Sequence, residues 1–210
     1  MIFTSITPEA FDHKNIPNDI HEMNDHIKNL LVNAPPSHEI PFEVLQDIRR
    51  QGGGLLAFQP YSDRAENRQV GDGDQKVTIR IFNHDSPDFI YMHIHGGGHC
   101  IGAADMQDQS LEKVSKELTC VVVSVDYRLA PTNPYPAAPD DCEIAATWLI
   151  ENSKKEFNIE KIIIGGESAG ANLSAVTLLR LKSKGMLDTI KGANLIYGSY
   201  DARLTPSAIR

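Results

Sequence analysis

The 210-residue sequence has no long hydrophobic run, few cysteines and no cluster of basic residues. No window approaches the ~18 uncharged apolar residues of a transmembrane helix, and the first residues lack the basic start and apolar stretch of a secretory signal. Lys and Arg total 20 against 28 Asp and Glu, a formal net charge of −8, which argues against a surface that follows nucleic-acid phosphates. We therefore expect a soluble, cytoplasmic protein without a membrane span or a nucleic-acid partner.

The three cysteines, Cys100, Cys120 and Cys142, are an odd and widely spaced set without a CxxC pair. This spacing suits neither a disulfide framework nor a zinc site. His93, His95 and His99 lie close together in the sequence, but they lack the carboxylates and cysteines of a metallohydrolase arrangement. We therefore expect reduced thiols, no metal and no cofactor.

The hydrophobic pattern changes at about residue 60. Before that point, apolar residues from Ile20 to Leu31 recur at spacings of three and four and predict a helix that stops before Ala34. A second, shorter helix fits Pro41 to about Arg50. We expect these helices to form a small segment over residues 1–60, distinct from the remainder, 61–210.

From about Gln75, predicted strands alternate with predicted helices. Residues 77–81 alternate apolar and polar side chains, the pattern of a half-exposed strand. Four further segments are apolar at nearly every position, which is typical of strands buried on both faces of a parallel sheet: 89–94, 120–125, 161–165 and 193–197. The alternation predicts an α/β fold with a doubly wound, mostly parallel sheet and right-handed crossovers.

One serine lies between a predicted strand and a predicted helix, in the sequence Gly166-Glu167-Ser168-Ala169-Gly170. A nucleophile in this position sits on a very tight turn with a strained backbone. Side chains two residues before and after it would collide, which accounts for the two glycines. A structural turn or a phosphate-cradling loop is the alternative, but no Lys follows the glycines and GxGxxG is absent. The pattern therefore favours Ser168 as a nucleophile.

Three consecutive glycines, Gly96 to Gly98, follow His95 at the end of the strand predicted over 89–94. Because glycines lack Cβ atoms, their amides can point into a cavity, and an acyl-transfer enzyme needs such donors ~3 Å from the developing oxyanion. A flexible turn is the alternative, since residues 52–54 form another glycine triplet after a short helix. The position at a strand end, where α/β sheets build their sites, favours an oxyanion loop.

Together with residues 126–131 (DYRLAP) and the proline-rich 135–139, these two motifs resemble the hormone-sensitive-lipase-like branch of the α/β-hydrolase fold. The resembling stretch runs from His93 to about Tyr200 and covers half the chain. The resemblance implies hydrolysis of carboxylic esters through an acyl-enzyme on Ser168. It also implies that residues 1–60 belong to a helical cap over the site and that 61–210 form the N-terminal part of the hydrolase core.

The resemblance carries further roles over to individual residues. The oxyanion hole would consist of the amides of Gly97, Gly98 and Ala169. His95 and Gly96 would support the oxyanion loop, with the His95 imidazole bracing it.

Other positions of the resembling stretch would be structural or would depart mildly from the family. Asp126 and Arg128 would form an ion pair at a strand end. His99 stands where the family usually has a large aromatic residue, and Glu167 replaces the commoner Asp beside the serine. Both departures would alter the shape or polarity of the pocket without abolishing the chemistry.

The severe departure concerns the rest of the catalytic triad, whose chain order in this fold is serine, acid, histidine. All eight histidines precede Ser168, and the acids after it are Asp188 and Asp201, neither of which matches the family's position. Without a base, a serine keeps an alcohol pKa and is a poor nucleophile at neutral pH. We expect the 210-residue chain alone to be inactive or nearly so.

Three explanations stay open. The chain could be one piece of a nicked or split hydrolase whose second polypeptide supplies the acid and the histidine. It could also be a truncated gene product, or a non-catalytic relative that binds a small molecule. The first is favoured, because the core motifs are intact. The resemblance implies two further strands, one before the acid and one before the histidine, and the sequence contains neither. Their absence would leave a sheet edge open to pairing with another copy of the chain. An amidase or deacetylase is the alternative enzyme on this scaffold, since serine chemistry does not distinguish amides from esters.

Overall fold

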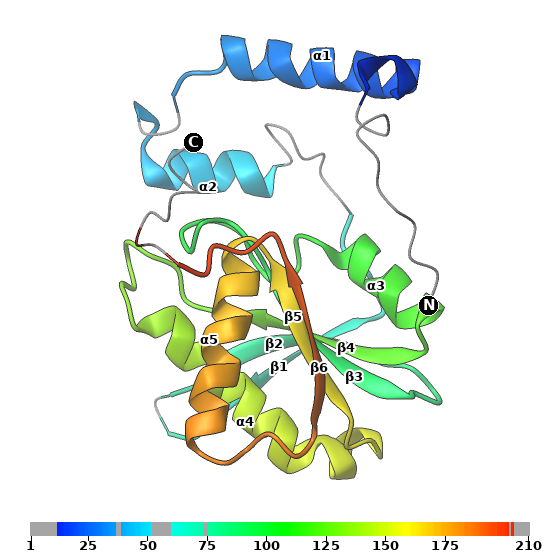
Figure 1. Cartoon of the computed structure of the whole chain (residues 1–210). Coiled ribbons are helices and arrows are strands. Elements are labelled where there is room, and N and C mark those ends of the chain that lie inside the picture. Colours follow the sequence, from blue (N-terminus) through cyan, green and yellow to red (C-terminus); the bar gives the residue numbers. More distant parts are fainter. Residues whose placement is uncertain (1–11, 37–38, 52–59, 74, 202, 204–210) are drawn as a thin grey trace. The chain divides into compact units, whose positions relative to one another are not determined.

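The computed structural model describes residues 12–36, 39–51, 60–73, 75–201 and 203 (Figure 1). The chain divides into two compact units, Met1–Ala57 and Phe58–Arg210. The first unit contains a 3-10 helix, η2 (His13–Asn15), and two α-helices, α1 (Asn18–Asn33) and α2 (Phe42–Arg50), which confirm the two predicted helices. No residue of α1 or α2 is buried. The cap role that the resemblance implies for this segment stays a prediction.

The second unit is built on one six-stranded sheet with the order β1-β2-β4-β3-β5-β6. Strands β3, β4, β5 and β6 run parallel, while β1 and β2 join the sheet antiparallel, beside β4. This arrangement confirms the predicted α/β class with a mostly parallel sheet. The strand bounds are β1 (Ala65–Val70), β2 (Val77–Phe82), β3 (Phe89–Ile94), β4 (Cys120–Asp126), β5 (Ile162–Glu167) and β6 (Ile190–Ile196).

Helices cover both faces of this sheet, which explains why its central strands read as unbroken apolar runs (Figure 1). Helices α4 (Ala137–Phe157) and α5 (Ala169–Ser183) pack against a core to which β4 contributes Val121, Val123 and Val125. Helix α3 (Asp108–Glu117) packs on the other face, against Cys120 and Val122 of the same strand. Alternate side chains of β4 therefore enter two different cores, and every residue of the strand up to Val125 is buried.

The structure places two of the three cysteines in the core and leaves Cys100 partly exposed. All three are free, and Cys120 and Cys142 are buried as small hydrophobic side chains. Burial raises the pKa of the Cys120 thiol to about 11. Among the helices that the structure describes, none is both long and apolar enough to cross a lipid bilayer.

The antiparallel end of the sheet differs from the sequence analysis in two ways. Strand β1 was not predicted, because its sequence AENRQV has no apolar alternation and only Val70 is buried. It is ordered by its pairing with β2 rather than by a pattern of its own. The half-exposed pattern predicted for residues 77–81 is wrong as well: Val77, Ile79, Arg80 and Ile81 are all buried.

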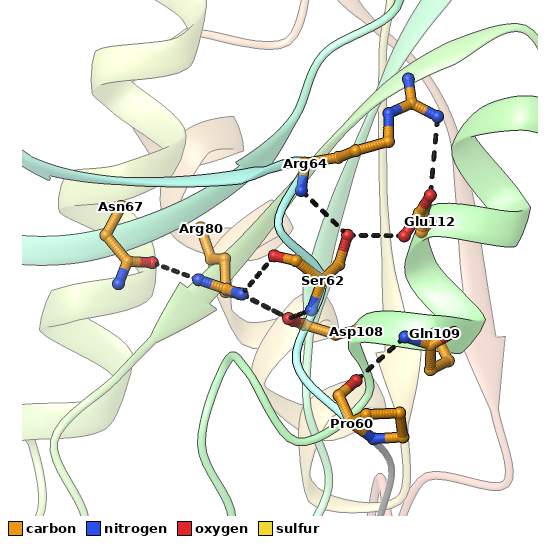
Figure 2. Close-up of polar contacts among 8 residues, drawn as sticks. All are labelled: Pro60, Ser62, Arg64, Asn67, Arg80, Asp108, Gln109 and Glu112. Carbon is orange, nitrogen blue, oxygen red and sulfur yellow. Dashed lines mark hydrogen bonds and ion pairs between the residues drawn. The ribbon is translucent and has the colours of Figure 1, made fainter.

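Arg80 can be buried because a carboxylate neutralises it (Figure 2). Its Nε donates to Oδ1 of Asp108 at 2.7 Å, and a terminal nitrogen of the guanidinium contacts the other carboxylate oxygen. The backbone amide of Ser62 donates to that same oxygen at 2.8 Å. Asp108 has an exposed fraction of 0% and opens helix α3, so the pair ties α3, β2 and the segment before β1 together.

We expect Asp108→Ala to lower the free energy of unfolding by about 3–5 kcal/mol, because it leaves the Arg80 guanidinium buried without its counter-charge. Urea unfolding followed by circular dichroism measures this loss. Lys113→Ala is the matched control, because it breaks an exposed pair with Glu117 on the same helix and should cost less than about 1 kcal/mol. Equal losses in the two variants would contradict the role given to the buried pair.

Candidate active site

Ser168 lies on the turn between β5 and α5 in a conformation that non-glycine residues rarely adopt. Its φ is 54° and its ψ is −119°, a strained combination that persists only where the surrounding structure enforces it. The Ser168 amide donates to the carbonyl oxygen of Ile196 in β6 at 2.9 Å, and its carbonyl accepts from the Asn172 amide in α5 at 3.1 Å. The residue itself is exposed, so a reactant can reach it.

The glycines around the serine are required by close backbone contact with the end of β3. A Cβ on Gly166 would lie 2.0 Å from the carbonyl oxygen of Ile94, and a Cβ on Gly170 would lie 1.9 Å from the same atom. No side chain fits at either position. The turn therefore packs directly onto the last residue of β3, which places Ser168 next to the loop that leaves that strand.

That loop begins with His95 and contains the predicted oxyanion glycines. Gly97 and Gly98 have φ values of 122° and 60°, and a Cβ on Gly97 would lie 1.9 Å from the carbonyl oxygen of Ile101. The Gly97 carbonyl accepts from the Ile101 amide at 3.0 Å, which closes the loop as a turn. Within the described part of the chain, no acceptor pairs with the amides of Gly97 or Gly98, so both are available to an anionic ligand.

His95 is buried beneath the loop and cannot act as a base from this position. Its ring stacks on Tyr127 with 4.2 Å between centroids, and its Nδ1 donates to the carbonyl of Gly96 at 2.7 Å. The Tyr127 hydroxyl in turn donates to the carbonyl of His95 at 2.8 Å. Burial lowers the pKa of His95 to about 4, because the charged imidazolium is poorly solvated there. His95 is therefore neutral at pH 7.

Glu167, which sequence reasoning treated only as a replacement for Asp, is a centre of hydrogen bonding. Its Oε1 accepts from the Gly96 amide at 2.6 Å and from the Gln107 side-chain amide at 2.7 Å, and its Oε2 lies 3.0 Å from Nε2 of buried His93. Burial alone would raise the pKa of this carboxyl, but the contacts with His93, Gly96 and Gln107 outweigh it and lower the pKa to about 2. The signal available in the sequence was an acidic residue directly before Ser168.

The ion pair expected between Asp126 and Arg128 is wrong. Asp126, the last residue of β4, accepts a hydrogen bond from the Ala104 amide at 3.1 Å. Arg128 lies beyond the strand and pairs with Asp141 near the start of α4, with 2.8 Å between Nη2 and Oδ1. The two side chains separate because Asp126 faces the loop after β3 while Arg128 follows the chain toward α4.

A mostly parallel sheet with a strained serine between a strand and a helix, packed against a glycine loop, defines an α/β-hydrolase architecture. The comparison with known families agrees: residues 91–210, more than half of the chain, match the family described as alpha/beta hydrolase fold. The chain belongs to this family, in the hormone-sensitive-lipase-like branch that its motifs indicate.

Several of the similar proteins of known name are esterases or hydrolases. The chain is 38% identical over 120 residues to carboxylesterase NlhH of Mycobacterium tuberculosis, covering 54% of this chain and 37% of that one. It is 40% identical over 151 residues to AB hydrolase superfamily protein C1039.03 of Schizosaccharomyces pombe, covering 67% and 44%. The solved structure of a hyperthermophilic esterase from Pyrobaculum calidifontis superposes with a TM-score of 0.71 at 26% identity, covering 85% and 58%. The chain thus spans about two fifths of these curated relatives.

We expect Gly166→Ala to lower the free energy of unfolding by at least about 2 kcal/mol, because the new methyl group overlaps the Ile94 carbonyl. Gly192→Ala in β6 is the matched control, since the nearest atom to its Cβ would be 4.0 Å away. Urea unfolding of both variants measures the difference. If Gly166→Ala were as stable as Gly192→Ala, the close contact between the turn and β3 would be wrong.

The lowered pKa of His95 predicts acid sensitivity in a defined window. His95 has a pKa near 6.5 in the unfolded chain and about 4 in the folded chain. The neutral ring therefore contributes fully to stability above pH 6.5, and this contribution declines as the pH falls, because the unfolded chain binds the proton first. By pH 5 the loss is about 2 kcal/mol.

We expect His95→Gln to remove most of this loss between pH 7 and pH 5, measured as urea unfolding free energies at the two pH values. His84→Gln is the control, because the half-buried His84 ring accepts from the Ser86 amide outside the site. An unchanged pH dependence in His95→Gln would contradict the lowered pKa of folded His95.

Proposed function

We propose that this chain carries the nucleophile and the oxyanion hole of a serine hydrolase that cleaves carboxylic esters. The observation that carries the proposal is the strained, exposed Ser168 packed against a loop whose Gly97 and Gly98 amides have no acceptor among the described residues. The similarity to carboxylesterases supports esters as the substrate class.

In the proposed reaction, Ser168 Oγ attacks the ester carbonyl while a base takes its proton. The amides of Gly97 and Gly98, with the first amide of helix α5 at Ala169, stabilise the oxyanion of the tetrahedral intermediate. The C–O bond to the alcohol breaks, the base returns the proton to the leaving alcohol, and an acyl-enzyme remains. Water, activated by the same base, then releases the carboxylic acid and restores the serine.

No base for Ser168 is assigned among the residues that the structure describes. His93 and His95 are buried and engaged with Glu167 and Gly96, and no histidine follows Ser168 in the sequence. We therefore propose that the acid and histidine lie outside these 210 residues, and the second polypeptide of a nicked or split hydrolase is the favoured source. Without it, the oxyanion hole and binding alone would leave a rate of about 10³-fold over water.

Strand β6 supplies a surface on which such a polypeptide could add strands. In the described residues β6 pairs with β5 on one side only. Leu195, Ile196 and Tyr197 at its end are 39%, 40% and 76% exposed, large values for apolar residues of a parallel strand. An unpaired edge with exposed apolar side chains favours addition of a further strand.

We expect a fluorophosphonate to label Ser168 in the assembly with its second polypeptide. Ser168→Ala should abolish this labelling and lower kcat for a short-chain ester at least about 10⁴-fold, because the attacking oxygen is removed. Peptide mass spectrometry locates the adduct, and an ester–anilide pair of matched acyl chains defines the bond cleaved. Ser183→Ala, an exposed serine at the other end of α5, is the control and should change neither readout.

A non-catalytic, small-molecule-binding relative is the second candidate, favoured by the absence of a histidine after Ser168. It would be supported if Ser168 stayed unlabelled in a folded assembly that contains the second polypeptide. Faster cleavage of the anilide than of the ester would instead assign an amidase.

A further inference from the structure

Glu167 bridges the two segments that an oxyanion hole and its nucleophile must keep in register. It is the residue directly before Ser168, and its Oε1 accepts the amide of Gly96, the residue directly before Gly97, at 2.6 Å. One carboxylate thus joins the position before the nucleophile to the position before the first oxyanion-hole glycine. The bond is short because an ionised carboxylate is the acceptor.

The loop lies against the nucleophile at this point. A Cβ on Gly96 would be 3.3 Å from Cβ of Ser168 and 2.9 Å from the carbonyl oxygen of Glu167. A side chain at position 96 would therefore crowd the serine turn, and the hydrogen bond from the Gly96 amide to Glu167 opposes movement of the loop away from that turn.

The carboxylate is itself fixed from two other directions. Gln107 donates to Oε1 at 2.7 Å, and Nε2 of His93 lies 3.0 Å from Oε2. The other ring nitrogen of His93 lies 3.2 Å from Ser124 Oγ, which holds the ring in place. The Glu167 side chain is only 19% exposed. With three donors on two oxygens, the carboxylate stays in one orientation.

Gln107 is held in place by its neighbour in the sequence. Asp108, the first residue of α3, is clamped by Arg80 and by the Ser62 amide in the buried cluster of Figure 2. Because Gln107 immediately precedes this anchored residue, its side chain leaves a rigid helix start. Arg80 thus fixes Asp108 by an ion pair. Asp108 fixes its sequence neighbour Gln107, and Gln107 donates a hydrogen bond to Glu167.

We propose that Glu167 is a positioning residue that holds the oxyanion loop against Ser168 through the Gly96 amide, with Gln107 and His93 setting the orientation of its carboxylate. This inference rests on the proposed function for its consequence, but its geometry can be tested without catalysis. Loss of the carboxylate frees the glycine loop, so the Gly97 and Gly98 amides no longer meet the oxyanion at a fixed distance.

The amide of Gly96 can be observed alone, because His95-Gly96 is the one His-Gly pair in the sequence. Labelling histidine with ¹³C at the carbonyl and glycine with ¹⁵N gives a single carbonyl-coupled amide signal in the 210-residue chain. We expect Glu167→Gln and Gln107→Ala each to accelerate hydrogen exchange of this amide about 10-fold or more, because a hydrogen bond to a charged group is lost or weakened.

Gln109→Ala is the matched control. Gln109 lies on helix α3, two residues after Gln107, and donates a side-chain hydrogen bond to the carbonyl of Pro60 at 3.0 Å (Figure 2) and not to Glu167. Its replacement should leave Gly96 exchange unchanged. Unchanged exchange in both Glu167→Gln and Gln107→Ala would overturn the proposal, and Gln107→Ala decides the matter if Glu167→Gln does not fold.

The catalytic consequence is measured in the assembly with its second polypeptide. We expect Glu167→Gln to lower kcat for an ester about 10- to 100-fold, with KM nearly constant, because the loss falls on the transition state. Unchanged kcat with full labelling of Ser168 would overturn the positioning role while the hydrolase proposal stands. Failure of the wild-type assembly to label at all would overturn the hydrolase proposal and leave the Gly96 exchange result intact.

Discussion

The contact between the end of β3 and the β5–α5 turn determines how the rest of this site is built. The carbonyl oxygen of Ile94 lies where a Cβ on either Gly166 or Gly170 would stand. Because neither position carries a side chain, the turn can approach the strand closely, and the chain continuing from Ile94 becomes the glycine loop beside Ser168. A tight backbone contact thereby brings together residues about seventy positions apart in the sequence.

Polar groups around that contact are organised so that each buried charge has a partner. Glu167 contacts three donors, His93 of β3, the Gly96 amide in the loop after it, and Gln107 just before α3. Asp108 neutralises Arg80 between the sheet and α3. His95, in contrast, is buried as a neutral ring on Tyr127. The polar groups that lose contact with water are therefore those that hold the backbone in position, while Ser168 stays exposed.

The sequence predicted those features that depend on local pattern. Continuous apolar runs located the central strands, because each lies between two helical layers, and the glycine spacing identified the turn at Ser168. It did not predict β1, whose sequence AENRQV becomes a strand only by pairing with β2. The burial of Arg80 and the pairing of Arg128 with Asp141 were missed too, because both depend on partners brought close by the fold. Roles assigned to Ser168 and the glycine amides stay predictions.

The central proposal is that this chain holds a preorganised serine site whose histidine lies outside these 210 residues, with a second polypeptide as its favoured source. Native mass spectrometry of material purified without denaturation, followed by the same sample denatured, tests it most directly. The account predicts a complex that separates on denaturation into the 23.2 kDa chain and a histidine-containing polypeptide. A 23.2 kDa chain found alone in both spectra would contradict it.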